Sequence, residues 1–140
     1  LESFRSRFLE VVRAELGPDP VPAVQMIDDE LSFKEAADFV FLKELEMMQP
    51  FGVGNPEPVF QSPPLLVKRR RLFGQQKNHV LLELTDESCK ITLQAKAWRQ
   101  AGEFPSDLEG RHIRLAYSPA IDMYNGAASV DVRIKDWKMV

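Results

Sequence analysis

The segment from Pro50 to Phe60, PFGVGNPEPVF, divides the chain into two parts with different hydrophobic periodicity. Pro50 cannot continue a helix that precedes it, Gly52 and Gly54 permit positive φ angles, and two further prolines favour an extended exit. Before this segment apolar residues recur at helical spacing, and after it they alternate with a period of two. The chain is therefore expected to fold as helices followed by a β-sheet.

Two amphipathic helices are predicted in the first part. Residues 1–16 carry apolar side chains at helical spacing, and a Gly-Pro pair follows them. Residues 17–25 contain three prolines and are expected to form an extended connector. A second helix is predicted to begin near Ser32, which can form a capping box with Glu35, and to continue up to the turn. The acidic triplet at residues 28–30 is interpreted as the solvated start of this helix and not as a metal site.

The second part shows the alternation typical of half-buried strands. A short helical turn is expected within residues 100–108, and Asn125-Gly126 predicts a tight type I′ turn between the last two strands. Helix and strands in this order are typical of an OB-fold, a small, partly open barrel. The predicted fold class is α+β, with N-terminal helices followed by a five-stranded OB-fold β-barrel. The five strands are predicted at residues 65–73, 79–85, 90–98, 111–123 and 128–137.

The central segment also resembles a known junction. Its order of residues is similar to the PFG-x-GNPEP-x-F motif that precedes the C-terminal OB domain of RecJ-type single-stranded-DNA exonucleases. Weaker similarity to the same family extends over nearly the whole chain. It is carried by Phe4, Phe8 and Val12, by residues 28–45, by Gly74-x-x-Lys77-x-His79, and by residues 124–126 with 134–136.

The resemblance implies two units and a function. Residues 1–49 would be a helical segment, comprising the end of a catalytic-core domain and a linker helix, and residues 50–140 an OB-fold nucleic-acid-binding domain. Together with the first residue, Leu1, it leads us to expect a piece of a longer 5′-to-3′ exonuclease that uses Mn or Mg. The chain has no DHH triplet and only two histidines, His79 and His112. We therefore expect no catalytic residue, metal ligand or cofactor in this chain and no nuclease activity of the chain by itself, whereas the longer parent protein is expected to be the exonuclease.

Charge and cysteine content agree with this expectation. Residues 1–60 hold 5 Lys/Arg and 12 Asp/Glu, a balance of −7, whereas residues 61–140 hold 13 and 9, a balance of +4. A basic second half is typical of a protein region that binds a polyanion. The single cysteine, Cys89, excludes an internal disulfide and fits a cytoplasmic protein. No apolar run approaches the ~18 residues of a membrane span, so no membrane partner is expected.

Binding of single-stranded DNA needs cations along the phosphates and flat side chains for base stacking. Each candidate also has a simpler role: a basic run can be a solvated strand edge, and a tryptophan is often a packing residue. A protein-interaction role, with a single-stranded-DNA-binding protein as one possible partner, and a purely structural bracing role therefore stay open. The predicted DNA-binding residues are Lys68, Arg69, Arg70, Arg71, Lys77, His79, Lys96, Trp98, Arg99, Tyr124 and Asn125.

Overall fold

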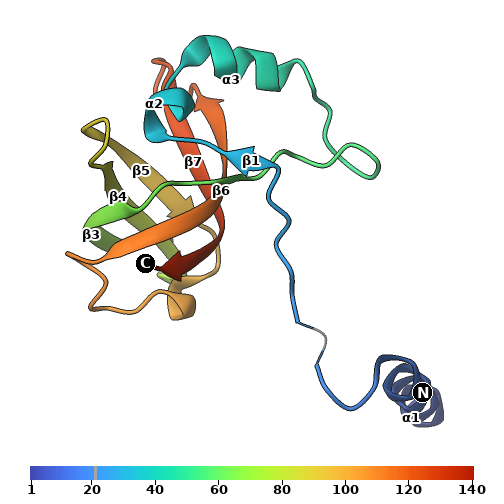
Figure 1. Ribbon diagram of the computed structural model, residues 1–140. Helices are drawn as coiled ribbons and strands as arrows, with labels where there is room; N and C mark the ends of the chain where they lie inside the picture. Colours follow the sequence, from blue (N-terminus) through green and yellow to red (C-terminus); the bar gives the residue numbers. More distant parts are fainter. Residues whose placement is uncertain (21) are drawn as a thin grey trace.

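The computed structural model describes residues 1–20 and 22–140 and has an α+β architecture (Figure 1). Among these residues, none of the helices combines the length and the apolar composition of a membrane-spanning helix. The helices are α1 (Glu2–Leu16), α2 (Phe33–Ala36), α3 (Phe39–Glu46) and the short 3-10 helix η1 (Ala101–Glu103). The strands are β1 (Asp29–Glu30), β2 (Phe60–Gln61), β3 (Leu65–Phe73), β4 (His79–Asp86), β5 (Ile91–Ala97), β6 (His112–Asp122) and β7 (Ser129–Met139).

The sheet closes on itself through its five longer strands. β3 pairs antiparallel with β4, β4 with β5, and β6 with both β3 and β7, while β5 and β7 run parallel. Strands β1 and β2 extend the sheet from β6, which gives seven strands in the part of the chain that the structure describes. The five predicted strands are thus present, and the structure adds two that are too short to be recognised from a period of two.

Alternate residues of each strand point into the ring, and the interior is apolar because these inward-pointing residues are mainly hydrophobic. Val80, Leu82 and Leu84 of β4 are fully buried, and so are Ile113 and Tyr117 of β6. The predicted inward faces are confirmed for these two strands. Buried residues of the other strands, of the α2 region and of the segment that holds Phe104 and Leu108 complete one core cluster.

The predicted second helix is two helices. Ser32 and Glu35 form the expected capping box at the start of α2. The carboxylate of Asp38 then accepts a hydrogen bond from the backbone N–H of Val40 and begins α3. A second N-cap inside the apolar run therefore interrupts the helix, because aspartate competes for backbone N–H groups.

The acidic triplet is not the solvated start of a helix, so that interpretation was wrong. Asp28 accepts a hydrogen bond from the backbone N–H of Val59 at 2.8 Å, and its own N–H donates to the carbonyl of Val59. Asp29 and Glu30 form β1, which lies parallel to β2. Backbone pairing with residues 59–61 places these acidic residues in a strand, although their charges would also be favourable at the N-terminus of a helix.

The predicted type I′ turn is also absent from the last hairpin. Asp122 pairs with Ser129, so residues 123–128 form a longer loop. Gly126 has a φ of 75°, but Asn125 is not among the described residues with positive φ. A type I′ turn needs positive φ at both central residues.

Hydrogen bonds attach the α2 region to the sheet. The hydroxyl of Tyr117 donates to the carbonyl of Leu31 at 2.8 Å, and burial raises the pKa of this hydroxyl. The buried carboxylate of Asp86 accepts from the backbone N–H of Phe33 at 3.2 Å. By contrast α1 has no buried residue, and it lies away from the sheet in Figure 1. The division at residues 49 and 50 stays a prediction.

Candidate nucleic-acid interface

The outer face of β3, β4 and β5 gathers several of the predicted site residues. Because side chains alternate along a strand, the residues that point away from the core form rows across the three strands. The strand register places Arg69 opposite Glu83, and Glu83 opposite Gln94. The next rows join Arg71, Leu81 and Lys96, and then Phe73 and His79. We call this surface the β3–β5 outer face.

Aromatic rings occupy the end of this face. The ring centroid of Trp98 lies 4.9 Å from that of His79 and 5.4 Å from that of Phe73. Both pairs meet edge to face, a favourable geometry for aromatic rings. Trp98 remains 51% exposed, so the packing holds the indole without burying it. This combination suits a stacking surface for bases.

A shallow depression adjoins the aromatic rings. The turn after β3 forms its wall. The backbone N–H of Lys77 donates to the carbonyl of Gly74, and the backbone carbonyl of Asn78 accepts from the N–H of Ala101. Amide side chains in a turn carry no recognisable signal, so sequence analysis missed three of the lining residues. The depression is lined by Gln75, Gln76, Asn78, His79, Trp98 and Arg99.

The four basic residues of β3 differ in exposure and in the side of the strand to which they point. A β-bulge between Val67 and Arg69 leaves Lys68 exposed and out of register. Arg69 and Arg71 are exposed and line a depression on the β3–β5 outer face. Arg70 is half-buried on the opposite side of the strand and donates to backbone carbonyls. The structure therefore brings two of the four basic residues to the face that carries Trp98.

Other predicted residues differ in how far their charges are compensated. The ammonium of Lys96 lies 3.3 Å from Asp131 and 3.8 Å from Asp122. Among the described residues, neither Lys77 nor Arg99 forms an ion pair. Tyr124 and Asn125 lie in the loop that follows Asp122, the last residue of β6 and one of the two partners of Lys96, and Tyr124 is 90% exposed.

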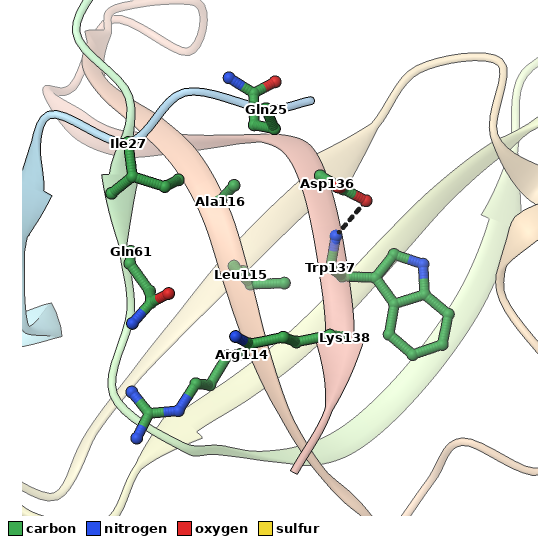
Figure 2. A pocket seen from close by; sticks show the side chains of 9 residues that line it. All are labelled: Gln25, Ile27, Gln61, Arg114, Leu115, Ala116, Asp136, Trp137 and Lys138. Carbon is green, nitrogen blue, oxygen red and sulfur yellow. Dashed lines mark hydrogen bonds between the residues drawn. The ribbon is translucent and has the colours of Figure 1, made fainter. Parts of the chain in front are cut away.

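A different depression lies on the outside of β6 and β7 (Figure 2). Arg114 and Lys138 face each other across the two strands there. The indole of Trp137 stacks on Phe104 at 5.1 Å and is therefore used in packing. None of the predicted DNA-binding residues lines this depression. This depression therefore lies outside the candidate interface.

Residues that could hold a metal ion are scattered. Within residues 1–20 and 22–140, no group of three or more His, Cys, Asp or Glu side chains has the arrangement of a metal site. His112 contacts Glu87 at 2.8 Å on the surface, and Cys89 is half-buried with its thiol near the carbonyl of Asp86.

These features define a class: a small module with a ring-closed β-sheet and a cationic, aromatic outer face. The family of RecJ OB domains matches residues 27–136, and the chain belongs to this family. The resemblance seen in the sequence is thereby confirmed.

Three relatives give the context of this domain. The chain is 26% identical, over 131 residues, to the single-stranded-DNA-specific exonuclease RecJ of Haemophilus influenzae, and the match covers 94% of this chain and 22% of that protein. Crystal structures of Thermus thermophilus RecJ with Mn²⁺ and with Mg²⁺ match it with TM-scores of 0.68 and 0.65. Their sequence identities are 23% and 22%, and the matches cover all of this chain and 20% and 21% of those chains. The chain thus spans about a fifth of the length of its relatives.

Proposed function

We propose that this chain is the single-stranded-DNA-binding OB domain of a RecJ-like 5′-to-3′ exonuclease. In this proposal strands β3 to β7 form the five-stranded OB barrel. The barrel holds the strand and directs it to a catalytic core that lies outside this chain and contains the divalent metal. The proposal is supported by family membership and by the Haemophilus relative, whose name states its specificity for single-stranded DNA.

The observation that carries the proposal is the arrangement around Trp98. A half-exposed indole lies at the end of a sheet face, next to Arg99, and Lys77 belongs to the 74–78 turn, of which Gln75, Gln76 and Asn78 line the same depression. Neither cation has a carboxylate partner among the described residues. Base stacking on an aromatic ring tolerates any sequence, and the neighbouring cations attract phosphates. Arg69 and Arg71 extend the positive charge along the same face.

One further observation favours a bracing role for α1. Its apolar side chains remain uncovered: Phe4 is 72% exposed and Phe8 57% exposed, and their rings stack on each other. An exposed apolar face of this kind is typical of a surface that packs against another domain. We propose that the catalytic core of the same polypeptide covers it. A single-stranded-DNA-binding protein is an alternative partner.

NMR titration of the isotopically labelled chain with a short single-stranded oligonucleotide tests the proposed function. We expect the largest chemical-shift changes at Trp98, Arg99 and the 74–78 turn, with smaller changes along β3. The depression on β6 and β7 serves as an internal control and should not respond. Changes confined to that depression or to α1 would contradict the proposed interface.

A further inference from the structure

His79 is held in one orientation by a hydrogen bond from the neighbouring strand end. The backbone N–H of Arg99 donates to Nδ1 of His79 at 2.9 Å. Nδ1 must therefore act as an acceptor, which places the proton of the neutral ring on Nε2. The bond joins the first residue of β4 to the residue that directly follows Trp98.

The opposite edge of the imidazole packs against the backbone of Gly74. A Cβ atom at this glycine would lie 2.7 Å from Cδ2 and 3.3 Å from Nε2 of His79. Gly74 also has a φ of 89°, a conformation that favours glycine. The ring is thus confined between the turn on one side and the N–H of Arg99 on the other.

This confinement is accompanied by an unusual backbone at Arg99. Its φ is 59° and that of Lys77 is 51°, so both lie in the left-handed region that few non-glycine residues adopt. Such conformations persist where surrounding contacts determine them, and they are concentrated at functional sites. Because Arg99 follows Trp98, the hydrogen bond to His79 fixes the end of β5 from which the indole projects.

We propose that His79 is a positioning residue that holds Trp98 as the stacking surface for one unpaired nucleobase, while Arg99 and Lys77 receive the flanking phosphates. This inference rests on the proposed function and gives its site a ligand class. The amide groups of Gln75, Gln76 and Asn78 line the same depression, where they can hydrogen-bond to the edge of the base. Nδ1 of His79 accepts the hydrogen bond from Arg99, and the opposite edge of its ring packs against Gly74. His79 therefore acts on the bound base through the position of Trp98.

The experiment combines fluorine NMR of the fluorotryptophan-labelled chain with oligonucleotide binding. His79→Phe keeps a ring but removes the acceptor, whereas His79→Asn restores an oxygen near the position of Nδ1. Arg99→Ala is the matched control, because it removes the guanidinium and keeps the N–H. The Trp137 resonance and thermal unfolding report whether the sheet stays intact.

We expect Trp98→Ala to lower the affinity for a single-stranded oligonucleotide by about 5- to 150-fold. His79→Phe should shift or broaden the Trp98 resonance without DNA and lower the affinity by a comparable factor. His79→Asn should restore both in part. Arg99→Ala should leave the resonance in place and reduce only affinity and its salt dependence.

Different results would overturn the positioning role of His79, the stacking role of Trp98 and the proposed DNA-binding function. Unchanged Trp98 resonance and affinity in His79→Phe would overturn the positioning role while leaving DNA binding intact. Unchanged affinity in Trp98→Ala would overturn the stacking role. Absence of any binding by the unmodified chain would overturn the proposed function itself, although the resonance would still decide whether His79 orients Trp98. If His79→Phe fails to fold, Gly74→Ala displaces the same ring from its other edge and must move the Trp98 resonance, or the inference is wrong.

Discussion

The guanidinium of Arg70 donates a hydrogen bond to the carbonyl of Phe104 at 2.8 Å. Phe104 is buried, so Arg70 satisfies a backbone acceptor near the core. Arg69 and Arg71, its neighbours in sequence, point to the other side of β3 and are exposed. One basic run thus contains a structural arginine between two residues available for a ligand.

The first prediction separates these roles. Arg70→Ala leaves the Phe104 carbonyl without its partner and should lower the free energy of unfolding by about 1–3 kcal/mol. The salt dependence of oligonucleotide binding should change little. Arg69→Ala with Arg71→Ala should leave stability nearly unchanged and reduce the single-strand salt slope by about 0.7 for each phosphate that is no longer neutralised. Denaturant unfolding and salt titrations measure both quantities, and the reverse pattern would refute this assignment.

The second prediction concerns three glycines that differ in one property at a time. Gly74 combines positive φ with close contact to His79, Gly110 has a φ of 81° and open space, and Gly102 has open space without positive φ. Replacement by alanine should therefore cost most at Gly74, about 1–3 kcal/mol from backbone strain at Gly110, and least at Gly102. Equal costs at Gly74 and Gly110 would show that the imidazole moves aside freely.

The third prediction concerns the acid stability of the fold. Burial of Asp86 opposes its ionisation, but hydrogen bonds from the Ser88 hydroxyl and the Phe33 N–H outweigh this effect and hold the pKa of Asp86 below its ordinary value. A carboxylate with a lowered folded-state pKa stabilises the fold above its unfolded pKa, and this contribution is lost as the pH falls through the folded pKa. Hydrogen bonds from the Ser32 side chain and backbone lower the pKa of Glu35 in the same direction.

We therefore expect the free energy of unfolding to fall as the pH drops below about 4. Asp86→Asn should be less stable at pH 7 and should lose less stability on acidification. Glu35→Gln provides the comparison at an exposed capping box. If the free energy of unfolding fell with the same slope below pH 4 in the unmodified chain and in Asp86→Asn, Asp86 would be excluded as the source of this acid sensitivity.

The fourth prediction tests the independence of α1. Because this helix has no buried residue, a chain that lacks residues 1–16 should unfold with a free energy within about 0.5 kcal/mol of the full chain. Its affinity for oligonucleotides should also be unchanged. A large loss of stability on truncation would mean that α1 contributes to the fold of this domain.

The sequence allowed prediction of the elements that depend on periodicity. The long strands, α1 and the capping box at Ser32 follow from local patterns and were found in the structure. Strands β1 and β2 were missed because two residues carry no period, and their formation depends on pairing with distant parts of the chain. The second N-cap at Asp38 was missed because an aspartate inside an apolar run is also compatible with one continuous helix.

The candidate site was predictable in composition but less so in arrangement. Basic and aromatic residues could be identified, yet the bulge after Val67 and the side of β3 on which Arg70 lies depend on tertiary packing. The ion pairs of Lys96 involve Asp122 and Asp131, which are distant in sequence. The bond from Arg99 to His79 likewise appears only when β4 and β5 are paired.

Binding of single-stranded DNA by this domain can be measured by titrating a fluorescently labelled single strand with the chain at several salt concentrations, with duplex DNA of the same sequence in parallel. We predict saturable binding to the single strand that weakens linearly in log–log form as salt rises, weaker binding to the duplex, and a loss of affinity in Trp98→Ala. Equal binding to both forms of DNA, or no binding at low salt by a folded chain, would contradict the proposed role of the domain.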